Sequence, residues 1–403
     1  MRETVTPAVL KRVVWAGANL SSFAQASTAL RVLLDLELSP KQVRRVTQQV
    51  GRDRLAERQQ QVATFKERPL RERVASPSPT VPADLGVVLM DGGRYQRRDH
   101  FGEAGFIGSH WKEDKVGLVL RMTSKVQHHD PHPDFPEWLA TAEVVREIAA
   151  LGTIDPEKSG ASETPDASVA SLVDPSPGQP RKTSGWSQLT PRLLSREVLA
   201  SSECGEEFGW HLEQVAWRTG VVDASRGAFV ADGASVNWTI HRQHFSQLTG
   251  ILDLMHALSY AWKAAAALDG HAAYRRYATA IWQGRVAEVV AELRTRLTDE
   301  SLDETTREPI ARAVTYYEHH RQRMDYPHYR RQGLPLTSSH IESAIKQINV
   351  RMKGSEKFFR RDSGETLLQL RADSLSDSQP MNAFWSRWLT RQSGANTYRT
   401  QPA

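Results

Sequence analysis

The chain has 403 residues, of which 39% are hydrophobic and 25% charged, so it can form two or three domains with real cores and is not wholly disordered. It contains no run of about 18 apolar residues, and its first residues lack the apolar stretch of a secretory signal, which predicts a cytoplasmic protein without a membrane partner. The single cysteine, Cys204, excludes an internal disulfide and a zinc site built on several cysteines.

Positive charge is concentrated in two regions. Residues 1–75 contain 14 Lys and Arg against 7 Asp and Glu, whereas the whole chain has a net charge of only +5. A second basic stretch, residues 346–361, has six Lys and Arg and one acid, Glu356. Two separated basic regions favour a polyanionic partner such as nucleic acid, although solvated helix faces would give the same pattern.

The first 75 residues predict a helical region. Residues 22–34 form one expected helix, and Ser39-Pro40 begins another, with serine as N-cap and proline in the first turn. Arg44 and Arg45 lie on the second helix, as in a helix-turn-helix motif that binds DNA, although any helical hairpin gives this pattern. Residues 74–83, rich in Pro and Ser, predict a linker.

Short apolar runs after the linker predict strands. They cover residues 86–91, 115–121, 228–232 and 248–253, and three of them end in aspartate. Residues 153–186, rich in Ser and Pro, predict a disordered insertion. Helical patterns occupy about 203–218 and 256–324, and a last helix starts near Ser338. The sequence therefore predicts a mixed α/β fold.

Several carboxylates are expected at the carboxyl ends of the strands, where α/β folds bind their ligands. Asp91 and Asp232 each close an expected strand, and the last helix could bring Glu342 to the same sheet edge. Hard oxygen ligands suit Mg²⁺ or Mn²⁺, and two such ions can promote phosphoryl displacement. Helix caps are the alternative explanation for strand-terminal aspartates.

The residues around these carboxylates resemble those of DDE transposases of bacterial insertion sequences. The matching segments are Met90-Asp-Gly-Gly-Arg94, Trp111-Lys-Glu-Asp-Lys-Val-Gly117, Ala231-Asp-Gly-Ala234, Asp253-Leu-Met-His256 and Gly333-Leu-Pro-Leu-Thr-Ser-Ser-His-Ile-Glu-Ser-Ala-Ile-Lys346. Asp253-x-x-His256 matches the D-x-x-H signature of Mutator-like and related groups, and the last segment is most similar to the ISKra-type family. The segments occur in the expected order over about residues 20–390.

The resemblance implies a ribonuclease H-like core, a mixed sheet, with an all-helical insertion and an N-terminal helical DNA-binding domain. We expect the N-terminal domain at 1–75, the first part of the core at 76–255, the insertion at 256–335, and the final core helix with a basic tail at 336–403. The implied activity is magnesium-dependent DNA transposition: cleavage at transposon ends and strand transfer during DNA recombination. Asp91, Asp232 and Glu342 would hold two Mg²⁺ or Mn²⁺ ions. The implied partners are double-stranded terminal repeats, target DNA and further copies of the chain, in the bacterial nucleoid.

Further roles are expected around this triad. Asp253 competes with Asp232 for the middle position, but we favour Asp253 and His256 as positioning residues. Lys346 lies one helical turn beyond Glu342, and we expect Lys346, Arg351 and Lys353 to bind DNA. The His-rich segment 127–134 is expected to be a polar loop more than a metal site, and Trp262 and Trp282 to be buried more often than bound to a base. The alternative function is a catalytically inactive, transposase-derived DNA-binding repressor.

Overall fold

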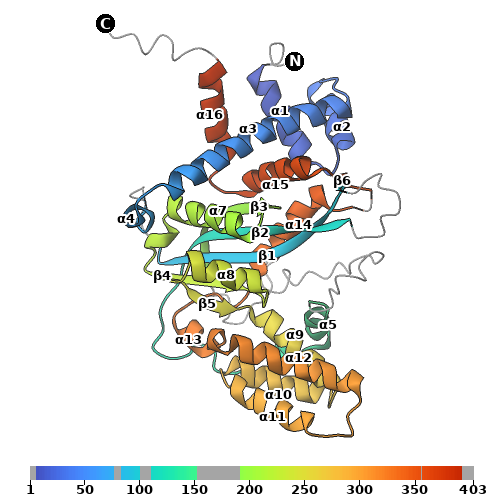
Figure 1. The fold of residues 1–403 in the computed structure, drawn as a ribbon, viewed down its shortest axis with the longest axis vertical. Coiled ribbons are helices and arrows are strands. Elements are labelled where there is room, and N and C mark those ends of the chain that lie inside the picture. The colour runs from blue at the N-terminus through green and yellow to red at the C-terminus, as the bar shows by residue number, and fades with distance from the viewer. Residues whose placement is uncertain (1–5, 77–82, 100–109, 152–190, 355, 393–403) are drawn as a thin grey trace.

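The computed structural model describes residues 6–76, 83–99, 110–151, 191–354 and 356–392, with a mixed sheet at its centre (Figure 1). The strands are β1 (Leu85–Arg97), β2 (Trp111–Thr123), β3 (Arg192–Ser201), β4 (Arg226–Ala231), β5 (Thr249–Leu252) and β6 (Phe358–Phe359). Their order is β3-β2-β1-β4-β5, and β6 pairs with the far end of β1. β2 runs antiparallel to both of its neighbours, β1 and β3, whereas β4 and β5 run parallel to β1. The prediction of a mixed α/β fold is confirmed.

The first strand is longer than its apolar run predicts. Residues 86–91 were expected to form the whole strand, but β1 continues to Arg97 because β2 pairs with it as far as Gln96 opposite Trp111. Asp91 therefore lies inside the strand and does not close it. The polar residues of the second half, which gave no strand signal, are held by cross-strand pairing that becomes visible only in the folded chain.

Helices cover the sheet and form a separate bundle beyond its β5 edge (Figure 1). Near the sheet lie α7 (Gly205–Arg218), α8 (Ser235–His244), α14 (Ser339–Met352) and α15 (Arg361–Leu375). The bundle contains α9 (Leu254–Ala266), α10 (His271–Trp282), α11 (Val286–Leu297) and α12 (Glu304–His320), with α5 (Ala142–Ala150) and α13 (Tyr326–Arg331) beside it. The helical block expected after His256 is confirmed. Within the described ranges, each helix is too short or too polar to cross a lipid bilayer.

The N-terminal helices are not a separate body. They comprise α1 (Pro7–Asn19), α2 (Phe23–Leu34), α3 (Pro40–Lys66) and α4 (Leu70–Arg73). The predicted start of α3 is confirmed, since Ser39 and Gln42 form a capping box. Two further helices absent from our prediction, α15 and α16 (Pro380–Gln392), pack against them through a small core of Val14, Ala18, Val50, Leu370, Phe384 and Trp385.

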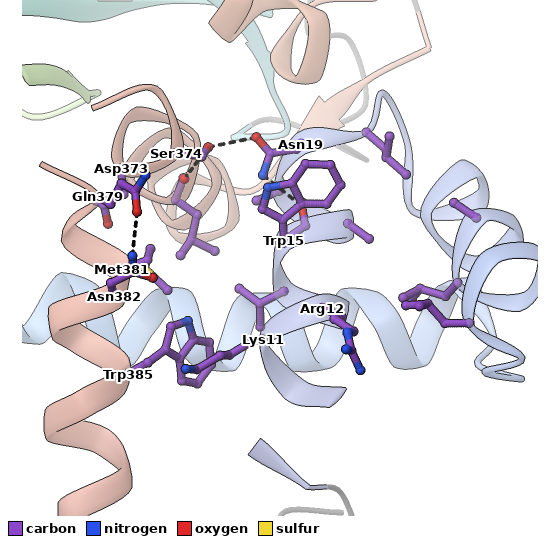
Figure 2. A pocket seen from close by; sticks show the side chains of 18 of the residues that line it. Lys11, Arg12, Trp15, Asn19, Asp373, Ser374, Gln379, Met381, Asn382 and Trp385 are labelled. Atoms are coloured by element: carbon purple, nitrogen blue, oxygen red, sulfur yellow. Dashed lines mark hydrogen bonds between the residues drawn. The ribbon is translucent and has the colours of Figure 1, made fainter. Parts of the chain in front are cut away.

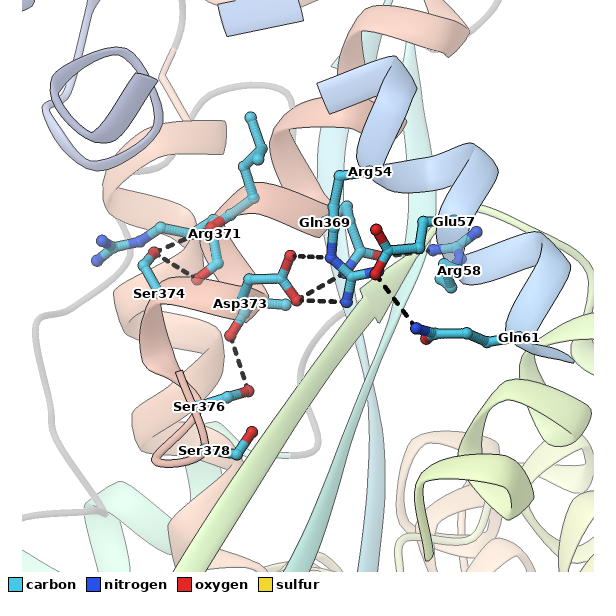
Figure 3. A network of polar contacts seen from close by, with 12 residues as sticks. Arg54, Glu57, Arg58, Gln61, Gln369, Arg371, Asp373, Ser374, Ser376 and Ser378 are labelled. Atoms are coloured by element: carbon cyan, nitrogen blue, oxygen red, sulfur yellow. Dashed lines mark hydrogen bonds and ion pairs between the residues drawn. The ribbon is translucent and has the colours of Figure 1, made fainter. Parts of the chain in front are cut away.

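Buried ion pairs reinforce this contact, and Figure 3 shows the first of them, between Arg54 and Asp373. Arg54 Nε of α3 lies 2.9 Å from Asp373 Oδ2 of α15. One turn later, Arg58 Nη1 lies 3.2 Å from Glu365 Oε1. The basic charge of residues 1–75 is thus divided between partners inside the fold and an exposed face of α3. Residues 77–82 of the expected linker 74–83 fall outside the described residues, as does the whole of the expected disordered insertion, 153–186.

Candidate active site

Asp91 and Asp232 occupy equivalent positions on neighbouring strands. Met90 of β1 pairs with Ala231 of parallel β4, so the next residue of each chain segment is an aspartate. Asp232 Oδ1 accepts hydrogen bonds from Ala234 N at 2.9 Å and Asn237 Nδ2 at 2.8 Å, which fixes the turn into α8. The register therefore brings together two carboxylates that are 141 positions apart in the sequence.

Asp253 connects the end of β5 to the helix that carries Glu342. It is fully buried and caps α9, where its Oδ1 accepts from His256 N at 2.9 Å. Its Oδ2 accepts from Ser338 N, the N-cap residue of α14, at 2.5 Å. A backbone bond from Leu254 N to Leu336 O, at 3.0 Å, reinforces the junction. Asp253 thus fixes where α14 begins, and with it the position of Glu342 in the first turn.

His256 is a cation within this acidic surrounding. Burial by itself lowers the pKa of an imidazole, but the Asp253 carboxylate, with Asp232 and Asp91 nearby, raises the pKa of His256 to about 10. The His256 Nδ1 atom lies 3.3 Å from Asp253 Oδ1. The same contact, together with the hydrogen bonds to Asp253, lowers the pKa of the aspartate despite its burial. The pair is therefore ionised at neutral pH.

Two other acids near this pair, Asp91 and Glu342, have raised pKa values. Burial and then the charge of Asp232 raise the pKa of Asp91 to about 7. Burial and then the charge of Asp253 raise the pKa of Glu342 to about 7, with Asp91 contributing and Lys346 opposing. We call Asp91, Asp232, Asp253 and Glu342 the carboxylate cluster. The negative charges of Asp232 and Asp253 thus oppose the ionisation of Asp91 and Glu342.

The side chains of the cluster are not gathered around one point. In the described part of the chain, no three His, Cys, Asp or Glu side chains stand close enough together to hold a metal ion. The backbone register and the Asp253 contacts bring the carboxylates into one neighbourhood, and side-chain rotation would decide whether they converge.

Helix α12 of the bundle covers the turn after Asp232, a contact that no sequence pattern predicts. A Cβ atom built on Gly233 would lie 2.3 Å from Tyr316 Cε2, so no larger residue fits there without a shift. Tyr316 stacks on Tyr260 of α9 with ring centroids 3.8 Å apart, and its ring lies 4.8 Å from that of His320. The bundle therefore shapes one wall beside the carboxylate cluster.

The residues expected to bind DNA divide into two groups. Lys346, Lys353, Arg44 and Arg45 are exposed, and Lys353 Nζ lies 5.9 Å from the centre of the Trp111 ring. Arg351 is buried, and this part of the prediction is wrong: Arg351 Nε donates to Gly17 O at 3.0 Å, and its guanidinium lies over the Phe23 ring. The basic stretch on α14 thus includes one residue that binds the protein's own N-terminal helices.

Two other sequence features have structural partners. Asp130 of the His-rich loop accepts from Arg330 Nε at 2.8 Å, and the His132 carbonyl accepts from Trp282 Nε1 at 2.9 Å. These contacts attach the loop to the bundle, in agreement with the expectation of a polar loop. Trp282 is completely buried, and Trp262 packs edge-on against Tyr274.

Comparison of the chain with protein-family models and with curated proteins finds no match to either.

Proposed function

We propose that this protein is a DNA transposase that cleaves phosphodiester bonds at transposon ends and joins the freed 3′-hydroxyl to target DNA. The observation that carries the proposal is the juxtaposition of Asp91 and Asp232 on parallel strands, with the Glu342 helix fixed beside them by Asp253. The mixed sheet, antiparallel in its first half and parallel in its second, supports the ribonuclease H-like core that the sequence resemblance implies.

The donor set fits divalent cations of the magnesium type. Asp91, Asp232 and Glu342 offer carboxylate oxygens, the ligands that Mg²⁺ and Mn²⁺ prefer. Burial, and after it the charge of a neighbouring aspartate, raises the pKa values of Asp91 and Glu342, and a bound cation would favour their ionised forms. Rotation of the three side chains toward one another is required, because as they stand no three acids converge.

The chain's own residues would position the DNA. When bound, two divalent ions would activate the attacking oxygen and stabilise the leaving oxygen. Asp91, Asp232 and Glu342 would hold those ions, while Asp253 and His256 keep α14 and the cluster in register. Lys346 and Lys353 are exposed on or just after α14, where they would contact phosphates. Arg44 and Arg45 of α3 would bind the terminal repeats, and two copies of the chain would bring two ends together.

The test is cleavage of a DNA duplex carrying the ends that flank the gene, with Mg²⁺ or Mn²⁺. We expect nicks at the end junction that disappear on chelation and in Asp91→Ala, while end binding is retained. The matched control is Asp114→Asn, because Asp114 of β2 is also a buried carboxylate with a pKa raised to about 7 by burial, and it is not part of the cluster. Equal cleavage by wild type and Asp91→Ala would contradict the assignment.

A catalytically inactive, transposase-derived DNA-binding repressor is the second candidate. The observation that favours it is the absence, among described residues, of three converged metal-binding side chains. Tight end binding by the wild type with no nick under any metal condition would support this candidate. Cleavage without joining of a pre-cut 3′-hydroxyl end would instead indicate a nuclease that lacks strand transfer.

A further inference from the structure

A mainly apolar groove lies between the N-terminal and C-terminal helices, on the opposite side of the molecule from the helical bundle (Figures 1 and 2). It has a volume of about 750 Å³ and is bordered by α1, α2, α15 and α16. Large apolar side chains form much of its lining, among them Trp15, Leu33, Leu34, Met381 and Trp385. The volume is within the range of roughly 300–1,000 Å³ typical of binding pockets, so several side chains of a partner could enter it.

The apolar surface at the groove is unusually open to solvent. Trp15 is 59% exposed and Leu33 is 76% exposed, although both belong to well-formed helices that bury other faces. Large exposed apolar side chains gathered along one groove are typical of an interaction site. The described residues therefore leave most of the surface of both side chains open to solvent.

The charge along the groove is positive. Its charged lining residues are Lys11, Arg12 and Asp373, and Asp373 is buried and paired with Arg54. Lys11 and Arg12 lie on α1 beside the apolar lining, as Figure 2 shows. A second copy docked face to face would bring two positively charged grooves together, which is unfavourable. Nucleic acid would match the charge but offers little apolar surface for Trp15 and Leu33.

We propose that this groove binds an acidic amphipathic helix of a partner protein. Leucine-type side chains of that helix would enter between Trp15, Leu33 and Trp385, and its acidic face would pair with Lys11 and Arg12. A helix placed in a groove between helices is a recurrent mode of peptide recognition. The site is separate from the carboxylate cluster, so the proposal does not depend on the transposase activity.

The experiment measures fluorescence anisotropy of two labelled 18-residue helical peptides on the full-length protein. Both peptides carry leucine at every third or fourth position; one has glutamate and the other lysine on the opposite face. We expect the acidic peptide to bind at least about tenfold more tightly than the basic one. Equal binding of the two peptides, or no binding of the acidic peptide, would overturn the proposal.

Matched variants locate the contact. Leu33→Gln should weaken binding of the acidic peptide about tenfold or more, whereas Val32→Gln should leave it unchanged. Val32 is the adjacent residue on the same helix and is 68% exposed, but it does not line the groove. Likewise, Arg12→Glu should weaken binding, and Arg31→Glu, outside the groove, should not. Equal effects of the paired variants would refute the assignment, because they would indicate non-specific binding.

Two further measurements separate the other occupants. If a 20-base-pair duplex displaces the peptide and its own binding is weakened by Leu33→Gln, the groove is a nucleic-acid surface and the proposal is wrong. Sedimentation tests for a second copy. If the protein self-associates, if Leu33→Gln abolishes this self-association and if the acidic peptide does not compete with it, the groove binds a second copy and the proposal is again wrong.

Discussion

Replacement of Asp253 by asparagine should destabilise the folded protein, because the isosteric amide has only one acceptor oxygen and no negative charge. Oδ1 of the asparagine could still cap α9, but an NH₂ group would then face Ser338 N, which now donates to Asp253 Oδ2 at 2.5 Å. A buried donor without a partner costs about 1–3 kcal/mol. The half-buried His256 cation, whose Nδ1 lies 3.3 Å from Asp253 Oδ1, would lose its counter-charge as well.

The magnitude follows from these two losses. Removing one partner of a fully buried ion pair costs about 3–5 kcal/mol. Because His256 is only half-buried, we place the total cost, with the unpaired Ser338 N–H included, in the lower part of that range. His256 can also lose its proton in the variant, which limits the cost. We therefore expect Asp253→Asn to lower the free energy of unfolding by about 3–4 kcal/mol at pH 6, measured by urea denaturation.

The pH dependence gives the prediction a second readout. The folded-state pKa of His256, about 10, is raised above its ordinary value of 6.5, so its contribution is complete below about pH 6.5 and is lost as the pH rises toward 10. The pKa of Asp253 is lowered, so its contribution is present above its ordinary value of 3.8 and is lost in acid. The difference between wild type and variant should thus be greatest between about pH 4 and 6.5 and should shrink toward pH 10.

The control is Asp303→Asn, at the N-cap of α12. Asp303 accepts from Thr306 N at 2.9 Å in the same manner, but it is exposed and has no histidine partner. Because asparagine and aspartate cap helices about equally well, this change should alter stability by less than about 0.5 kcal/mol. Equal effects of the two substitutions, or a pH-independent difference, would refute the reasoning.

Three further predictions concern stability. Asp91→Asn should raise the free energy of unfolding by about 1–3 kcal/mol at pH 8 without divalent metal, because an acid whose pKa is raised to about 7 destabilises the folded protein as the pH rises above its ordinary pKa of 3.8. This gain should vanish below pH 4. Added Mg²⁺ should raise the melting temperature of the wild type more than that of the variant. Gly233→Ala should cost about 1–3 kcal/mol, since its Cβ would lie 2.3 Å from Tyr316, whereas Gly92→Ala, whose Cβ would find its nearest neighbour at 3.4 Å, should be tolerated in thermal unfolding. Asp373→Ala should cost about 3–5 kcal/mol in denaturant unfolding because it leaves Arg54 buried and unpaired, while Glu308→Ala, which removes an exposed pair with Arg312, should cost less than about 1 kcal/mol.

The sequence by itself determined the local elements and the candidate acids. Short apolar runs predicted β4 and β5 to within two residues at each end, because a buried parallel strand needs apolar side chains on both faces. Ser39-Pro40 fixed the start of α3, since capping depends on neighbouring residues alone. Local signals also identified the candidate acids: Asp91 and Asp232 each end an apolar run, and Glu342 lies just after the expected start of the last helix.

Only the tertiary structure decided how these parts are used. The extension of β1 past Asp91 depends on pairing with β2, and the role of Asp253 depends on Ser338, 85 residues away. Arg351 looks like any exposed base in the sequence, but α14 points it at the carbonyls of α1. The cover of Gly233 by Tyr316 likewise follows from the packing of α12. Such contacts join residues far apart in the chain, and no periodicity or neighbouring residue encodes them, because their partners are chosen by packing.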